Sequence, residues 1–389
     1  MSATKHRYNG YKSFDYLGPG RHSKFAVSKE DDRVSPFFVP MTEHQEERLL
    51  KIIADNPVIS LHDHLRVLPE NITDLYGYYA AGRVHTGYAG IASSPLDAVF
   101  GNQVLKGASW EDTIHELGMR SCDAAHSGLL VKASGADDIF SAKQDGKIAW
   151  FPMIEHASCI GDELDKLDVL YGLGVRMLGL VFSHTNAIGG GLSEARDGGL
   201  TNFGAKVVSR MNALGLPIDL SHAGDLTTMD AINVSAKPVF IGHTGARTVW
   251  GTKRMKPDDV IKACADKGGI FGIEAAPHTT MSRSHKEHDI ESVMEHFEYV
   301  KNLVGIDSVS FGPDTMFGDH VGLHRQSAAA YADDSSDEKF VMSEYVRGCE
   351  NPSETWWNIP RWLIAHGYSD EDIAKVIGGN VIRVLKETF

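Results

Sequence analysis

The sequence predicts an α/β protein folded as a (β/α)8 barrel of the TIM type, in one domain with an N-terminal arm and C-terminal helices. Three observations predict this fold. Short apolar segments alternate with amphipathic segments of helical period along most of the 389 residues. The apolar segments are continuous, which is typical of parallel strands buried on both faces. Nearly all of them end in a histidine or an acidic residue, and the strand ends of such a barrel meet at one face.

The chain begins with a segment that we expect to be an extended arm. Residues 1–41 are rich in Gly, Ser, Lys and Tyr and show no sustained period. We expect them to lie on the body of the protein or on a neighbouring subunit. The barrel domain covers residues 42–389. It opens with a helix at 42–56, because Thr42 is a good N-cap residue and an apolar stripe follows it as far as Asn56.

The strands and helices of the barrel follow in order. Seven apolar, β-rich segments are predicted strands: 57–62, 148–155, 175–184, 216–222, 237–243, 268–274 and 307–314. The eighth strand is expected near 96–103. Between the strands, amphipathic helices are predicted at 161–174, 202–215, 225–236, 257–268 and 290–305. Two closing helices fill residues 358–389, and Ser369 is the N-cap of the second.

Two segments do not fit this repeating pattern. Residues 70–115 are rich in Gly, Tyr and Ala and are longer than a barrel loop needs, so we expect an insertion over the active face. The acidic segment 332–339 is expected to be a solvated loop.

Composition and charge argue against several classes of protein. The formal net charge is −14, which disfavours a nucleic-acid partner because no basic stripe can form. Residues 1–24 lack the apolar core of a signal peptide, and no apolar segment approaches the roughly 20 residues needed to span a bilayer. We therefore expect a cytoplasmic protein with no membrane partner, assembled as a homo-oligomer. The four cysteines form no C-x-x-C pair and are expected to be reduced thiols.

The polar residues at the strand ends are the main functional signal. The set consists of His62, His64, Glu155, His184, His222, His243 and Asp314. One such residue is usually structural, but a whole set at equivalent strand ends indicates a shared site. Imidazoles and carboxylates are ligands of zinc and similar ions. Two ions bridged by Glu155 and a hydroxide would use most of the set, with one histidine pair on each ion, His62 with His64 and His222 with His243. Such a centre predicts hydrolysis of an amide or ester.

Longer motifs extend this signal over residues 57–389. In order, they are MIEHAS, LYGLGVRMLGLVFSHTN, MNALGLPIDLSHAG, PVFIGHTGAR, KRMKPDDV, LVGIDSVSFGPD and GYSDEDIAKVIGGNVIRVL. In this combination they resemble the membrane dipeptidase (renal dipeptidase) family of the amidohydrolase superfamily. The resemblance implies a zinc-dependent hydrolase that cleaves a dipeptide or an N-acyl amino acid with a free carboxylate. It also implies tolerance of a D-residue on the C-terminal side of the cleaved bond.

The resemblance further implies roles for single residues. Glu155 would be the carboxylate that bridges two zinc ions. His184 would help to hold the substrate or to stabilise the oxyanion. Arg254 would grip the terminal carboxylate of the substrate, a role that suits a planar, two-pronged donor. Asp314 would take a proton from the bridging water and pass it to the leaving amine.

Other interpretations of these residues stay open from the sequence alone. His184 could be a core histidine, and Arg254 could pair with the acids of the helix that follows it. Arg247 is a nearby competitor for the substrate carboxylate. His156 and Asp63 could orient the metal ligands, or have no functional part.

The sequence also departs from the family pattern. His62-x-His64 stands where the family usually has His-x-Asp, which removes one negative charge from the metal site. Glu155-His156 stands where the family tends to have Glu-Gly. These departures keep two other functions open. One is a divergent enzyme of the superfamily that acts on another small amide, a lactam or a carboxylated substrate, including non-hydrolytic cleavage. The other is a barrel that binds a ligand without catalysis.

Overall fold

Eight parallel strands form a closed circle in the computed structural model, which describes residues 5–18, 24–103, 108–285, 287–331 and 343–389. In order around the circle they are β1 (Ile59–Asp63), β2 (Ala98–Asn102), β4 (Ile148–Ile154), β5 (Met177–Gly179), β6 (Ile218–Asp219), β7 (Phe240–Thr244), β8 (Ile270–Ile273) and β9 (Val309–Phe311). The circle closes between β1 and the chain after β9, because Asp314 N donates to His62 O (3.0 Å) and His64 N donates to Thr315 O (2.8 Å). The predicted (β/α)8 barrel is confirmed.

Every predicted strand segment overlaps a strand of this barrel, and the eighth, expected near 96–103, is β2. The ladder is shorter than the apolar segments, above all at β6, which has only two residues. The chain leaves the ladder after Gly179 and after Asp219 and runs into loops. These loops carry His184 and His222.

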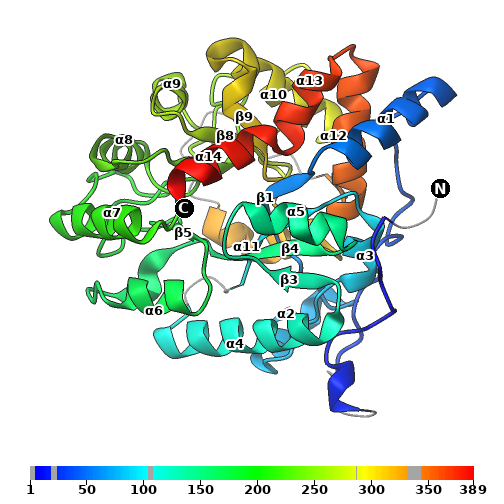
Figure 1. Cartoon of the computed structure of the whole chain (residues 1–389). Coiled ribbons are helices and arrows are strands. Elements are labelled where there is room, and N and C mark those ends of the chain that lie inside the picture. The colour runs from blue at the N-terminus through cyan, green and yellow to red at the C-terminus, as the bar shows by residue number, and fades with distance from the viewer. Residues whose placement is uncertain (1–4, 19–23, 104–107, 286, 332–342) are drawn as a thin grey trace.

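Helices lie around the outside of the strands (Figure 1). Along the chain they are α1 (Glu43–Asp55), α2 (Leu75–Ala80), α3 (Tyr88–Ser93), α4 (Trp110–Ser127), α5 (Asp137–Gln144), α6 (Lys166–Gly172), α7 (Asn202–Leu214), α8 (Asp225–Val234), α9 (Asp258–Asp266), α10 (Ile290–Val304), α11 (His320–Tyr331), α12 (Pro352–Ala365), α13 (Asp370–Ala374) and α14 (Asn380–Thr388). Thr42 caps α1 as predicted, since its side chain accepts from Gln45 N. Ser369 caps α13 and accepts from Asp372 N.

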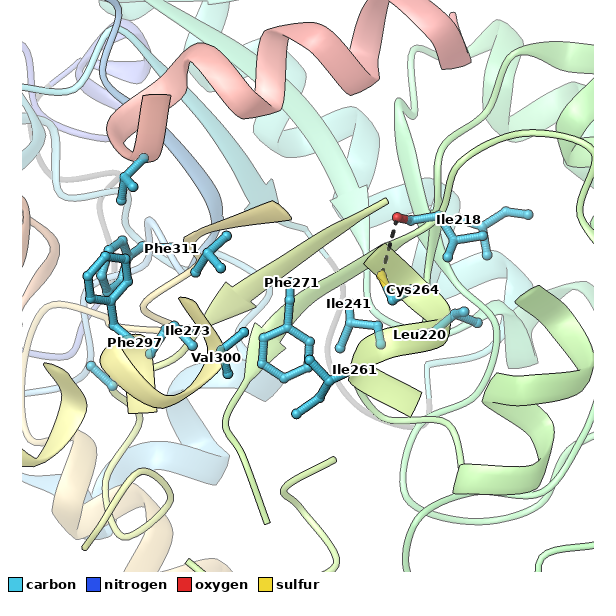
Figure 2. Packing of buried hydrophobic residues seen from close by; sticks show 14 of the residues in the cluster. Ile218, Leu220, Ile241, Ile261, Cys264, Phe271, Ile273, Phe297, Val300 and Phe311 are labelled. Atoms are coloured by element: carbon cyan, nitrogen blue, oxygen red, sulfur yellow. Dashed lines mark hydrogen bonds between the residues drawn. The ribbon is translucent and has the colours of Figure 1, made fainter. Parts of the chain in front are cut away.

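Apolar side chains on the strands pack outward against the helices. Figure 2 shows Phe271 of β8 beside Ile261 of α9, and Phe311 of β9 beside Phe297 of α10. The rings of Phe297 and Phe311 stack with their centroids 5.5 Å apart. Burial of one such side chain contributes roughly 1.5–3 kcal/mol.

The last helix, α14, closes the amino-terminal end of the barrel. Its apolar side chains Val381, Val384 and Leu385 cluster with the first residues of three strands, Ile59, Phe240 and Ile270. Figure 1 shows α14 crossing this end of the barrel. The carboxyl ends of the strands therefore form the opposite, functional face.

The described part of the N-terminal arm lies on the body of the protein. Lys5 Nζ donates to Asp97 Oδ2 (2.7 Å), and Tyr11 Oη donates to Asp123 Oδ1 (2.6 Å). Phe14 is buried. The arm is thus tied to the barrel by charge, hydrogen bonds and apolar contact.

The region before β4 differs most from the sequence prediction. No element is predicted for residues 116–147, which contain most of α4, the short strand β3 (Leu130–Lys132) and α5. β3 pairs with β4 outside the circle. A capping box at Ser109 and Asp112 begins α4 and is the local signal that could have located it.

The segment 70–115, expected to be an insertion, is partly barrel. It includes β2, and it also includes α2 and α3. Gly87 and Gly90 approach the ring of Phe317 so closely that a Cβ on either would meet it at 2.3 Å. This part of the segment therefore covers the chain after β9. The acidic segment 332–339 lies outside the described residues.

No helix in the described part of the chain is long and apolar enough to cross a membrane. The four cysteines are free thiols, and Cys159, Cys264 and Cys349 are buried.

Candidate metal centre

The candidate site lies at the carboxyl ends of five strands. His62 is in β1, Glu155 follows β4, His222 follows β6, His243 is in β7 and Asp314 follows β9. Because parallel strands point the same way around a barrel, residues far apart in sequence meet at this face. The predicted set therefore converges, with the exception of His184.

The first group consists of His62, His64, Glu155 and Asp314. One nitrogen or oxygen from each lies within 4.8 Å of the others. His62 Nε2 is 2.9 Å from Glu155 Oε1 and 3.3 Å from Asp314 Oδ1. His64 Nε2 is 2.9 Å from Asp314 Oδ1 and 3.4 Å from Glu155 Oε1. Two imidazoles and two carboxylates thus face one point.

The second group consists of Glu155, His222 and His243, all buried, with ligand atoms within 4.8 Å of one another. The Nε2 atoms of His222 and His243 face each other at 3.0 Å. Zn–N bonds are about 2.0–2.1 Å, so two nitrogens at this spacing fit one shared cation. Glu155 belongs to both groups.

Two buried polar atoms without hydrogen-bond partners support a cation at the first group. Among the described residues, His62 Nε2 and Asp314 Oδ1 are buried side-chain atoms with no hydrogen-bond partner of good geometry. Buried polar atoms are normally satisfied, because an unpaired one costs desolvation energy. A metal ion would satisfy these atoms, so the residues present fit the group that their chemistry implies.

The electrostatics also favour a positive charge at the first group. Burial lowers the pKa of His62, but the nearby carboxylates of Asp314 and Glu155 raise it further, to about 10. Burial opposes the ionisation of Glu155, yet His62 and His64 hold its pKa at about 2. The same two histidines keep the pKa of Asp314 well below its usual range. The two carboxylates are therefore ionised and attract a cation.

The histidines of the second group are held neutral. Burial lowers the pKa of His222 well below 6.5, and the charge of Arg254 adds to this shift. Burial likewise lowers the pKa of His243, with a further contribution from His62. A neutral imidazole is the form that binds a metal.

Asp63, for which the sequence left two interpretations open, has a clear structural contact. Its Oδ1 accepts from Thr315 N (2.9 Å) and Thr315 Oγ1 (2.7 Å). Its Oδ2 accepts from Ser60 Oγ (2.7 Å) and Trp356 Nε1 (3.0 Å). The carboxylate thus joins the end of β1 to the chain after β9, and so holds His62 and His64 beside Asp314.

Asp219, at the end of β6, has a structural role similar to that of Asp63, and the sequence did not predict it. It accepts from Ser221 Oγ (2.7 Å) and from Gly242 N (2.8 Å). Ser221 Oγ in turn accepts from His243 N (2.9 Å). Asp219 and Ser221 together fix the backbone that carries His243. The presence of both polar residues inside the apolar segment LPIDLSH is the sequence signal that could have indicated this contact.

Aromatic contact holds the ring of His222. Phe182 stacks on it, with centroids 4.1 Å apart and an angle of 19° between the planes. His156 is buried and meets Phe182 edge-on at 5.9 Å. His156 therefore belongs to the packing around the second group.

His184 lies apart from both groups. Its side chain is 66% exposed, and its Nδ1 is 4.0 Å from Glu194 Oε1. It is not a core histidine. An exposed imidazole on the loop after β5 is free to contact a bound molecule.

Arg254 is held by the protein itself. It donates to Ser221 O (3.2 Å), to His243 O (2.9 Å) and to the carboxylate of Glu274. Burial raises the pKa of Glu274, which follows β8, to about 8, and Arg254 opposes that shift. The competitor Arg247 is paired with Asp225 through two hydrogen bonds of 2.6 and 3.0 Å.

Comparison with known proteins decides the family. The family model described as membrane dipeptidase (peptidase family M19) matches residues 97–328, which is more than half of the chain. The chain belongs to the membrane dipeptidase family. The match contains Glu155, His222, His243 and Asp314, and the geometry adds His62 and His64 from the strand before it. The resemblance found in the sequence motifs is confirmed.

Individual relatives agree with this assignment. Dipeptidase tcpJ of Claviceps purpurea is 28% identical over 283 residues, which cover 72% of this chain and 60% of that protein. The chain spans about half the length of the curated dipeptidases that it matches. The crystal structure of an amidohydrolase from Pseudomonas aeruginosa has a TM-score of 0.72 and 25% identity, and covers 87% of this chain and 98% of its own.

A metallo peptidase from Rhodobacter sphaeroides has the same fold. Its TM-score is 0.67 at 19% identity, with coverage of 86% of this chain and 99% of its own. That structure was solved with a phosphinate mimic of the dipeptide L-Ala-D-Ala.

Proposed function

We propose that this member of the membrane dipeptidase family is a zinc-dependent hydrolase that cleaves the amide bond of a dipeptide or an N-acyl amino acid. The observation that carries the proposal is the pair of overlapping groups that share Glu155. Family membership supports the reaction class. The resemblance to the family also leads us to include substrates with a D-residue on the C-terminal side.

The ligand atoms divide into two sets. His62 and His64 with Glu155 would hold one zinc ion, and Glu155 with His222 and His243 the other. Zinc ions bound there would lower the pKa of a water between them and polarise the carbonyl of the scissile amide. The neutral state of the second histidine pair and the ionised state of Glu155 support this division.

Asp314 is the proposed general base and then acid. Its carboxylate is ionised and lies 2.9 Å from His64 Nε2, beside the first group. It accepts a proton from the attacking water and passes that proton to the nitrogen of the leaving amine. His184 and Arg254 are the proposed substrate-binding residues.

A substrate panel tests the proposal. Zinc-loaded protein is assayed with L-L dipeptides, L-D dipeptides and N-acyl amino acids, and release of the amine product is measured. We expect turnover of at least one class. Glu155→Gln should abolish it and lower the metal content, because the shared ligand is lost. The matched control is Glu163→Gln, since Glu163 lies soon after the same strand with a side chain that is 67% exposed. Inactivity of the folded, zinc-loaded protein on every class would refute the proposal.

The cytoplasmic location, the homo-oligomeric state and the division into residues 1–41 and 42–389 stay predictions from the sequence.

A further inference from the structure

A small pocket lies between α4, β3 and β4, and none of the candidate metal ligands lines it. Arg120 of α4, Trp150 of β4 and Thr86 are among the residues that line it. The pocket offers the centre of a water molecule about 10 Å³. That space is enough for one water molecule or one monatomic anion, and too small for an organic acid.

Arg120 brings a poorly satisfied guanidinium to this pocket. Its side chain is only 10% exposed. In the described part of the chain it makes one hydrogen bond, a long one of 3.5 Å from Nη1 to Thr86 Oγ1. Its Nε is buried and has no hydrogen-bond acceptor there. Because a guanidinium carries five N–H donors, most of the donors of Arg120 are unused.

Arg66 places a second guanidinium close to the first. It is buried, and its Nε and Nη2 have no acceptor among the described residues. Arg66 stands opposite Thr86 in an isolated antiparallel bridge, so its side chain leaves the backbone on the same side as that of Thr86, which contacts Arg120. Burial lowers the pKa of Arg120, and the charge of Arg66 adds to this shift. The two positive charges therefore repel each other.

The carboxylates around the two guanidiniums do not balance their charge. Glu116 Oε2 is 3.8 Å from Arg120 Nε, which is longer than a hydrogen bond. Asp123 is buried nearby, but it accepts from Tyr11 Oη (2.6 Å), Phe14 N (2.8 Å) and Tyr88 Oη (3.0 Å). Within the described ranges, Arg66 makes no salt bridge. Buried charges are normally paired, because an unpaired one costs desolvation energy.

Two further polar groups bear on what occupies the pocket. Trp150 Nε1 is a buried donor that has no acceptor among the residues described. Gln103 also lines the pocket, and its buried Oε1 has no donor in the same part of the chain. A water molecule could satisfy Trp150 and Gln103. A neutral water would, however, leave the charges of Arg66 and Arg120 unbalanced, so an anion suits the pocket better.

We propose that this pocket binds a monatomic anion, chloride under ordinary conditions. The anion accepts from Arg120 and Trp150 and balances the positive charge shared with Arg66. Leu65 also lines the pocket, so a bound anion ties α4 to the segment that follows β1. The inference is independent of the proposed amide hydrolysis, because its test requires no substrate.

Thermal unfolding tests whether chloride binds in solution. The Tm of the whole chain is measured in sodium chloride and in sodium gluconate at equal ionic strength, because gluconate is too large for the pocket. In the wild type, chloride at about 0.1 M should raise the Tm by about 3 °C, with saturation as the chloride concentration rises. Arg120→Met should lose this difference between the two salts.

A matched control separates the pocket from other effects of chloride, including binding to a metal ion. Arg210 lies on α7 with a side chain that is 32% exposed, and it pairs with Asp168. Arg210→Met should keep the full chloride response of the wild type. An equal loss of the response in both variants would overturn the inference.

Bromide locates the anion, since it has the charge of chloride, a similar radius and strong anomalous scattering. Wild-type crystals soaked in sodium bromide should show an anomalous peak within hydrogen-bonding reach of Arg120 and Trp150. If Arg120→Met does not fold, the wild-type Tm and this peak decide the question together. Absence of the peak would mean that water fills the pocket. A peak without any chloride dependence of the Tm would mean an adventitious ion only, and either result would overturn the inference.

Discussion

At the scale of single residues, the backbone of Asp314 marks it as unusual. Its φ is 57°, in the left-handed region that few residues other than glycine adopt. Such a conformation costs of order 1 kcal/mol or more, and it persists where surrounding contacts hold it. Here Asp314 N donates to His62 O (3.0 Å), which closes the barrel and turns the carboxylate toward the histidines of β1.

Replacement of Asp314 by Asn tests its role in proton transfer. Asn tolerates the left-handed conformation as well as Asp does, so the backbone and the bound metal should be retained. The loss of the proton acceptor should lower kcat by about 10²–10⁴, with little change in KM. The measurements are kcat, KM and metal content by elemental analysis.

The control for this variant is Asp307→Asn. Asp307 lies before β9, at the opposite end of the strand, and its side chain is 70% exposed. It should behave as the wild type. An unchanged kcat in Asp314→Asn would move the proton-transfer role to another residue.

At the scale of elements, the site depends on how closely neighbouring strands approach. A Cβ added at Gly179, the last residue of β5, would lie 1.9 Å from Glu155 O. The chain after β4 can therefore pass beside β5 only because position 179 has no side chain. The place of Glu155 is decided in part by this glycine.

Gly179→Ala should move the backbone of Glu155. We expect a loss of about 1–3 kcal/mol in the free energy of unfolding, as is typical of an overpacked core, together with lower metal content. Chemical denaturation and elemental analysis measure the two effects. Gly172→Ala is the control, because a Cβ there meets no atom within 4 Å. If Gly179→Ala kept the stability and the metal content of the wild type, β5 and the chain after β4 could move apart without a loss of free energy, and the prediction would be wrong.

The N-terminal arm carries a buried histidine whose protonation depends on whether the arm is docked. His6 is buried, and one ring nitrogen, Nε2, lies 3.2 Å from Ser94 O. Burial, with a contribution from Lys5, lowers the pKa of His6 from 6.5 to about 4. The unfolded arm therefore binds a proton more readily than the docked arm, so docking is favoured fully above pH 6.5 and weakens as the pH falls toward 4.

Acidification should release the arm. The change can reach about 3 kcal/mol at low pH, since one pKa unit corresponds to about 1.4 kcal/mol. The hydrogen-exchange protection factors of residues 5–18, which correct for the slower chemical exchange at low pH, should fall between pH 7 and pH 4.5 in the wild type, and much less in His6→Gln. The exposed His44 is the control position, where His44→Gln should leave the pH dependence unchanged. An equal response in the wild type and in His6→Gln would contradict the role of His6.

At the scale of the whole molecule, the candidate metal ligands come from strands that are far apart in sequence. His62 and Asp314 are separated by most of the barrel, yet both lie in one group with Glu155. A ligand that binds only the folded protein stabilises it by mass action. Metal binding should therefore stabilise the closed barrel as a unit, in addition to any catalytic effect.

Removal of metal should lower the thermal stability of the protein. Protein purified without added metal is expected to contain about two equivalents per chain, and a metal at 1,000 times its dissociation constant adds about 4 kcal/mol. Thermal unfolding before and after treatment with a chelator, then after zinc is returned, measures the effect. A metal-free protein that is fully folded and insensitive to chelator would contradict both the metal centre and the proposed function.

The sequence by itself determined the barrel and most of the candidate metal centre. Apolar continuity and helical period are local properties, and the position of a polar residue at a strand end is local too, so His62, Glu155, His243 and Asp314 could be assigned to one face without coordinates. The elements of residues 116–147 were not predicted, although the capping box at their start was available.

Only the tertiary structure decided which side chains pair across the barrel. The contacts of Asp63 with Trp356 and of Arg254 with Glu274 join residues whose spacing in the sequence carries no periodic signal. Such pairs depend on the distance through space between separate strands and helices, and on burial, which makes an unpaired charge costly. For this reason the pairing of Arg254 with the buried Glu274 could be found only in the fold.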